Sequence, residues 1–216
     1  SRHLPPLVLA ILSTILSAWL VWPAIKAGGN VFVGSVTEDS AMVAGYFRAL
    51  SVDGLTPFSS GLLSSIGWPE GVPNPADTNL ASPLSIAVTW LFGLIFGVLG
   101  GQLALAVVGL WLTAFTGGWV AWQWTRSWVP TVFGLLALGV TPMTLHWSSA
   151  LPALAHTWLL VLVLFFSLRL MTDPAGRRWP LSVAFVVCVL WHPYFAAFAG
   201  LGVLSVLVWA LAYRRV

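Results

Sequence analysis

The chain of 216 residues is 59% hydrophobic, and only 7% of its residues are charged. A soluble domain needs roughly a quarter of its residues charged to cover its surface, so this composition excludes a soluble globular protein. The nine Lys and Arg residues stand singly or in pairs between apolar runs, a pattern typical of topology determinants rather than of nucleic-acid binding. We therefore expect an all-α fold, a multi-pass transmembrane helical bundle with about six spans.

The first predicted span covers residues 7–22 and is preceded by Arg2. Trp19 and Trp22 close it as interfacial rings, and we expect Pro23 to end the helix. A cleaved signal peptide is the alternative, but the many apolar runs that follow favour a retained signal anchor.

Residues 23–83 differ from the rest of the chain, because they are rich in Gly and Pro and hold five of the six carboxylates. We expect a long, ordered outer loop with a short juxtamembrane helix from Ser40 to Leu50. Glu38 and Asp39 would lie in the first turn of that helix, where the helix dipole favours negative charge. Loops of this length are usually functional or disordered, and the aromatic and Pro content argues against disorder.

Further apolar runs follow the loop, at 84–99, 103–124, 131–145, 151–170, 181–191 and 195–212. Basic residues follow the second, fourth and last of these runs. If all three basic clusters face the cytoplasm, run 84–99 must begin and end on the outer side. It would then be a re-entrant or surface-lying helix, although its hydropathy alone would allow it to cross. Four glycines would let its backbone bend: Gly93, Gly97, Gly100 and Gly101.

Two of the runs are short. Run 131–145 stops at Thr141–Pro142, and run 181–191 stops at His192–Pro193. Non-helical backbone at membrane depth is tolerated only where it lines a cavity walled by protein. Both stops therefore predict a cavity on the outer side. Cys188 lies inside an apolar run and is expected to pack in the core.

These elements predict a single transmembrane module over residues 1–216. It would consist of a first span within 1–22, an outer region at 23–101 with juxtamembrane helices, and five further spans within 102–216. The N-terminus would face the cytoplasm and the outer region would face the outside of the plasma membrane. Because the sequence starts without Met and ends just after a basic pair, we expect the module to be a fragment of a longer protein.

Four short motifs occur in order along the chain. They are Thr-Glu-Asp-Ser…Tyr-Phe-Arg at 37–48, Pro-Glu-Gly…Asn-Pro-Ala-Asp-Thr-Asn…Ser-Pro-Leu at 69–84, Ala-Leu-Pro-Ala-Leu-Ala-His-Thr-Trp at 150–158 and His-Pro-Tyr at 192–194. Together with the layout they resemble the membrane-embedded GT-C glycosyltransferases, in particular the uncharacterised bacterial members related to the YfhO-like group. The resemblance covers most of residues 30–195. The family's catalytic modules are longer, and their acceptor-binding parts lie beyond the point where this chain stops.

The resemblance implies inverting transfer of a sugar from a polyprenyl-phosphate donor to a glycan or protein acceptor on the outer face of the membrane. Such a transfer needs a carboxylate base and a cation for the departing phosphate. Asp39 is the expected base, with Glu38 as its partner or alternate. Either carboxylate would be the ligand if a divalent cation, Mg²⁺ or Mn²⁺, takes part. The alternative is that the pair only charges a helix N-terminus.

Further candidate substrate-binding residues are polar groups expected on the same side: Arg48, Glu70, Asn74, Asp77, His156, His192 and Tyr194. The histidines would bond a phosphate or a sugar hydroxyl, or else they are hydrogen-bonded packing residues. The Asn and Asp residues would bind sugar hydroxyls or a cation, or else they build turns, as Asp53 before Gly54 is expected to do. Arg48 is the only Arg on the outer side in this topology.

Two other classes of protein remain open. A transporter or flippase for a lipid-linked or hydrophobic solute should place acids within spans and show internal repeats, and the sequence shows neither. A non-catalytic membrane scaffold is the third class. The sequence has no zinc-ligand spacing and no phosphate-binding Gly-rich motif, which excludes a soluble nucleotide-sugar enzyme.

Overall fold

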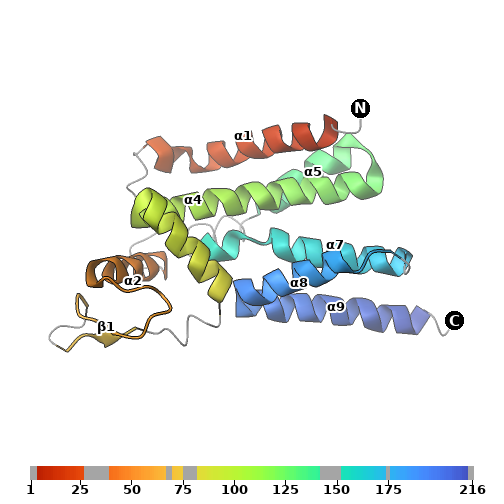
Figure 1. Ribbon diagram of the computed structural model, residues 1–216. Coiled ribbons are helices and arrows are strands. Elements are labelled where there is room, and N and C mark those ends of the chain that lie inside the picture. The colour runs from red at the N-terminus through yellow and green to blue at the C-terminus, as the bar shows by residue number, and fades with distance from the viewer. Residues whose placement is uncertain are drawn as a thin grey trace.

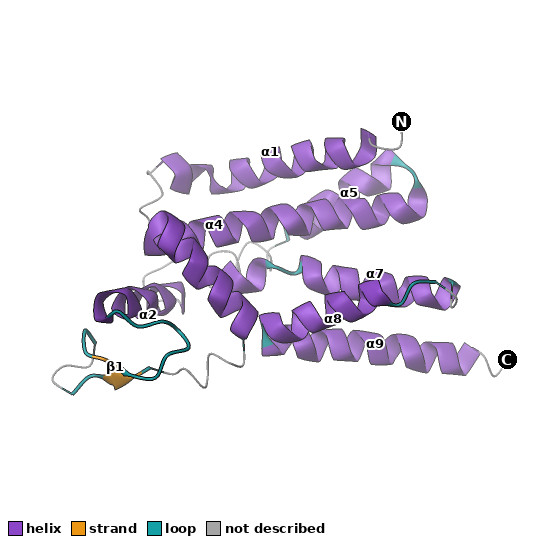
Figure 2. Ribbon diagram, viewed as in Figure 1, coloured by secondary structure: helices purple, strands orange, loops and turns teal. Residues whose placement is uncertain are grey.

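The computed structural model is mostly helical and describes residues 4–26, 39–66, 70–74, 82–141, 152–173 and 176–213. The helices are α1 (Leu4–Lys26), α2 (Asp39–Asp53), α4 (Pro83–Thr125), α5 (Trp128–Gly139), the short 3₁₀ helix η1 (Pro152–Ala155), α7 (Trp158–Thr172), α8 (Trp179–Trp191) and α9 (Pro193–Tyr213). Two short strands, β1 (Leu62–Leu63) and β2 (Val72–Pro73), pair as an antiparallel hairpin (Figures 1 and 2). The all-α class is therefore confirmed for the described residues.

The long helices lie side by side in one bundle (Figure 1). Helix α4 packs on α1, α5 and α7, while α7, α8 and α9 contact one another. The N-terminus, the α4–α5 turn, the α7–α8 turn and the C-terminus all lie at one end, and α2 and the β-hairpin lie at the opposite end. We call these the basic end and the α2 end, since Arg126, Arg169, Arg177 and Arg178 lie in or beside the turns of the first.

Three helices of the described chain are long and apolar enough to cross a membrane: α1, α4 and α9. Helices α5, α7 and α8 are apolar but shorter. The 12 residues of α5 extend about 18 Å at 1.5 Å per residue, against a hydrocarbon layer of about 30 Å. Length and composition thus support three membrane-spanning helices, fewer than the six spans expected from the sequence.

Two expected boundaries are wrong. Pro23 lies inside α1, which continues to Lys26. A proline inside a helix removes one intrahelical hydrogen bond and can kink the helix without ending it. Run 151–170 is not one helix, because η1 ends at Ala155 and α7 begins only at Trp158. At this break, Ala155 and His156 are buried against α4.

Other expected boundaries are confirmed. The short helix expected from Ser40 to Leu50 is α2, which begins at Asp39 and ends at Asp53. Helix α8 ends at Trp191, His192 has extended backbone, and α9 starts at Pro193. Helix α5 ends at Gly139, two residues before Thr141, and Pro142 lies outside the described residues.

Helix α4 bends at Gly97, where φ is 75° and ψ is 164°. This backbone conformation is rarely open to a residue with a side chain. The segment before the bend, 83–96, crosses the bundle obliquely at the α2 end (Figure 1), whereas the segment 98–125 runs along α1. The two segments touch at Gly101, where an added Cβ would lie 2.6 Å from the Gly93 nitrogen. The expectation that glycines bend this run is confirmed at Gly97.

Candidate functional site

A cavity of about 130 Å³ lies at the α2 end, where α2, both segments of α4, η1 and the α8–α9 junction meet. We call it the junction cavity. Its lining consists of Val43 and Phe47 of α2, Ser82, Ser85, Ile86, Thr89, Gln102 and Leu105 in or beside α4, Leu154 of η1, and His192. The cavity thus brings α2 next to the helix break before α9.

Buried polar side chains of α4 line this cavity. Ser85, Thr89 and Gln102 are each less than one tenth exposed. The Ser85 hydroxyl donates to the Ser82 carbonyl at 3.2 Å, and the Thr89 hydroxyl donates to the Ser85 carbonyl at 2.7 Å. Both hydroxyl oxygens keep acceptor capacity for a ligand's O–H groups.

None of these residues was predicted from the sequence as a site residue. The signal was the helical spacing of Ser82, Ser85 and Thr89, which puts them on one face, together with Gln102 at the start of an apolar segment.

Helix α2 covers the cavity on one side. Phe47 stacks on Trp90 of α4 at 5.9 Å between ring centroids, and it belongs to a small core with Leu50 and Leu63. Asp39 is the first residue of α2. Glu38, its expected partner, lies outside the described residues.

His192 is the histidine that faces the junction cavity. Its Nδ1 accepts the backbone N–H of Tyr194 at 3.2 Å. In the neutral imidazole the proton is then on Nε2, which can donate to an oxygen of a ligand. The Tyr194 ring packs on the imidazole at 4.9 Å between centroids, but Tyr194 is 60% exposed and does not line the cavity. The structure thus supports a site role for His192 more than for Tyr194.

His156 has a different environment, which fits the packing alternative. It is 2% exposed, its Nδ1 accepts the Trp158 indole N–H at 3.0 Å, and its Nε2 lies 3.2 Å from the Leu105 carbonyl oxygen. Because Nδ1 is an acceptor, Nε2 is the protonated nitrogen and donates to that carbonyl. Trp191 covers the ring at 4.4 Å between centroids. With both nitrogens bonded inside the protein, His156 holds η1 to α4 and is not placed to bind substrate.

The Asn74 side chain forms its hydrogen bonds within the loop and with α2. Its Oδ1 accepts the Tyr46 hydroxyl at 2.8 Å, and its Nδ2 donates to the carbonyls of Thr56 and Ser59 at 3.0 and 2.6 Å. These bonds tie the β-hairpin to α2 and use both amide hydrogens. The structure therefore favours the turn-building alternative for Asn74 over contact with a sugar.

Asp53 also organises the loop, as expected of a turn former. It ends α2 before Gly54, which has a φ of 67°, and its carboxylate accepts the hydroxyls of Ser64 and Ser65 at 2.7 and 2.8 Å. The hydrogen bonds from Ser64, ahead of those from Ser65, hold the pKa of Asp53 below its usual value.

The remaining predicted residues are not gathered at the cavity. Arg48 is exposed on α2 and Glu70 is exposed in the hairpin turn, and neither lines the cavity. Asp77 lies outside the described residues. Among the residues that the structure describes, no three His, Cys, Asp or Glu side chains converge on a metal position.

Comparisons with protein-family models, with curated proteins and with solved structures found no match to this chain.

Proposed function

We propose that the chain is a membrane-embedded glycosyltransferase of the GT-C type, which transfers a sugar from a polyprenyl-phosphate donor to a glycan or protein acceptor at the outer face of the membrane. The observation that carries the proposal is the junction cavity. It brings the helix that begins with Asp39, the buried polar face of α4 and the Nε2–H of His192 to one end of an apolar bundle.

The proposed topology places the basic end in the cytoplasm and the α2 end outside. Arg126, Arg169, Arg177 and Arg178 gather at the end that also holds both termini (Figure 1), and basic residues favour the cytoplasmic side. In this arrangement α1, the segment 98–125, α5, α7, α8 and α9 cross the membrane. Segment 83–96 lies obliquely beneath α2 without crossing. The short helices leave their outer ends below the surface, next to the cavity.

In the proposed reaction the acceptor oxygen attacks the anomeric carbon of the sugar, and the bond from that carbon to the donor phosphate oxygen breaks. Asp39 takes the proton of the acceptor hydroxyl. The Nε2–H of His192 donates to an oxygen of the phosphate or sugar. Ser85, Thr89 and Gln102 bind sugar hydroxyls. A cavity of about 130 Å³ is smaller than the 300–1,000 Å³ typical of whole ligands, so it takes one end of the donor while the polyprenyl chain stays in the bilayer.

The test is sugar transfer from a polyprenyl-phosphate-sugar donor in proteoliposomes. Asp39→Asn keeps the size of the side chain and removes the base, so we expect a loss of about 10²–10⁴-fold in rate. Asp173→Asn is the matched control, because it removes a carboxylate at the basic end, and we expect it to keep the wild-type rate. Equal rates for Asp39→Asn and wild type would remove Asp39 as the base.

The transporter alternative has no specific observation in its favour. The carboxylates of the described residues are Asp39, Asp53, Glu70 and Asp173. None of them lies inside one of the apolar helices. A carrier coupled to protons or cations usually holds such groups within its spans.

A further inference from the structure

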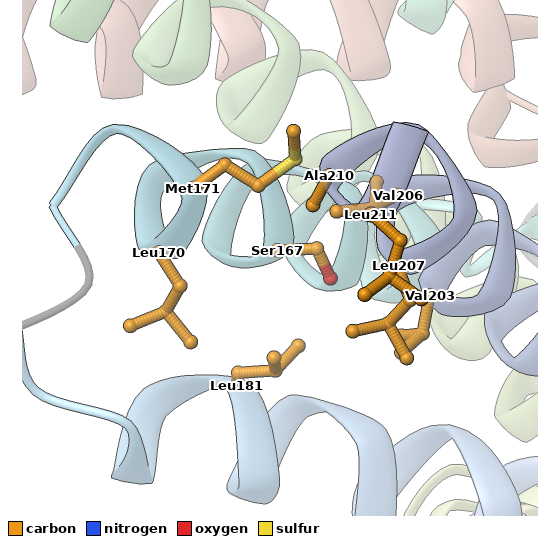
Figure 3. A pocket seen from close by; sticks show the side chains of 9 residues that line it. All are labelled: Ser167, Leu170, Met171, Leu181, Val203, Val206, Leu207, Ala210 and Leu211. Atoms are coloured by element: carbon orange, nitrogen blue, oxygen red, sulfur yellow. The ribbon is translucent and has the colours of Figure 1, made fainter. Parts of the chain in front are cut away.

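A second cavity, of about 250 Å³, lies at the basic end between α7, α8 and α9 (Figure 3). Its walls are Leu170 and Met171 of α7, Leu181 of α8 and the face of α9 from Val203 to Leu211. The lining residues of α9 follow helical i, i+3, i+4 spacing, so they form one continuous apolar face. We call this space the tail cavity. Its shape and lining suit a hydrocarbon chain.

One polar group points into the tail cavity. The Ser167 side chain is 4% exposed, and its hydroxyl has no hydrogen-bond partner among the residues that the structure describes. Figure 3 shows this oxygen directed into the space between the helices. A helical serine can bond the carbonyl four residues earlier, and a buried hydroxyl without any partner is costly. A ligand that brings an acceptor oxygen to this depth would remove that cost.

A third cavity, of about 480 Å³, adjoins the tail cavity and shares Leu170 with it. It is lined by Arg169 and Arg177, opposed by the single carboxylate of Asp173, and by the exposed ring of Trp179. The two guanidinium groups outnumber the one carboxylate in this lining. The arrangement offers a net positive site for an anion, at the level where an interfacial Trp ring is expected.

We propose that an anionic phospholipid of the surrounding bilayer binds across these two cavities. Its phosphate lies between Arg169 and Arg177, because guanidinium groups suit phosphate oxygens in charge and geometry. One acyl chain fills the tail cavity, which is too small for a whole lipid. Ser167 donates to an ester carbonyl oxygen. Ser167 lies two residues before Arg169 on α7, about 3 Å deeper along the helix axis, and an ester group lies just inside the phosphate of a lipid.

This site is at the opposite end of the bundle from the junction cavity, so it does not depend on the proposed sugar transfer. In the proposed topology it faces the cytoplasmic leaflet, where basic pockets between helices bind acidic headgroups. The lipid would join α7, α8 and α9 at the end where their loops and the C-terminus meet.

The experiment is native mass spectrometry of the full chain, purified in detergent and incubated with equal amounts of dioleoyl phosphatidylglycerol and dioleoyl phosphatidylcholine. We expect preferential retention of one phosphatidylglycerol. Arg169→Gln and Arg177→Gln should each reduce that preference about fivefold, since a basic residue near a membrane surface contributes about that factor. Arg126→Gln is the matched control, because it removes a charge at the same end but outside both cavities, and it should leave the preference unchanged.

Two further measurements test the acyl chain separately. Ala210→Leu fills the tail cavity without a change of charge and should abolish retention of the lipid, while glycerol 3-phosphate should not displace it. Equal retention of both lipids by the wild type would overturn the proposal. An equal loss of lipid preference in Arg126→Gln and Arg169→Gln would also overturn it, because the preference would then come from the overall surface charge of this end and not from the cavity. Full displacement by glycerol 3-phosphate would reduce the site to one for free phosphate esters and would also overturn it.

Discussion

The close contact between the two segments of α4 predicts how much stability the substitution Gly101→Ala will cost. In Gly101→Ala the new Cβ would lie 2.6 Å from the Gly93 nitrogen, 2.7 Å from the Phe92 carbonyl carbon and 2.8 Å from the Gly93 Cα. These are backbone atoms, so no change of rotamer relieves the overlap. Carbon atoms pack at about 3.5–4.0 Å, so segment 83–96 must move by about 1 Å. Overpacking of this kind costs about 1–3 kcal/mol.

Gly93→Ala is the matched control, because an added Cβ there has no atom within 4 Å and the gain in helix propensity is the same. Cys188 provides the assay: it is the only cysteine and is fully buried, so a fluorogenic maleimide reacts with it on unfolding. At about 2–4 °C per kcal/mol for a chain of this size, Gly101→Ala should melt about 2–12 °C below Gly93→Ala. Equal melting temperatures would refute the packing of the two segments, and with it the shape of the junction cavity.

Three further predictions follow from single contacts. His156→Ala should lower the free energy of unfolding by about 2–5 kcal/mol in the same maleimide assay, because it leaves a cavity under Trp191 and unpairs the Trp158 indole; a change in donor affinity with no loss of stability would restore a site role. The lowered pKa of Asp53 means that its carboxylate stabilises the loop above the unfolded-state pKa and that this contribution is lost as pH falls through the folded-state pKa. Limited proteolysis of loop 54–74 should therefore accelerate in acid for the wild type and be independent of pH in that range for Asp53→Asn. In a Cys188→Ala background, a membrane-impermeant maleimide should label Ser60→Cys from outside and leave Thr172→Cys unlabelled in intact cells; the reverse pattern would invert the proposed topology.

The helices could be predicted from the sequence where hydropathy and backbone chemistry agree. The bend at Gly97 follows from the freedom of glycine to adopt a positive φ, and the break at His192–Pro193 follows from the restrictions that proline places on its own backbone and on the residue before it. Pro23 was misjudged because a proline removes one hydrogen bond from a helix but need not end it. The interruption between Ala155 and Trp158 was missed because it depends on tertiary contacts. At this break His156 forms hydrogen bonds with the Leu105 carbonyl and the Trp158 indole.

The candidate site was predicted less completely than the fold. Local sequence gives the chemistry of a side chain but not its partners, so His156 and His192 could not be told apart. In the structure both nitrogens of His156 are bonded to the protein, whereas His192 lines the junction cavity. For Asn74 the sequence left sugar binding and turn building open, because its partners Tyr46, Thr56 and Ser59 come together only on folding. Ser85 and Thr89 were missed because small hydroxyl residues in an apolar helix usually satisfy themselves on its backbone.

The most direct measurement of the central claim uses the wild-type chain and a polyprenyl-phosphate donor whose sugar bears a photoreactive diazirine. After irradiation in proteoliposomes, the crosslinked peptides are identified by mass spectrometry. The proposed function predicts adducts in α2 and in residues 82–102 of α4, the elements that line the junction cavity, and predicts that excess unlabelled donor suppresses them. Adducts confined to α7, α8 and α9 at the basic end, or none that unlabelled donor suppresses, would contradict it.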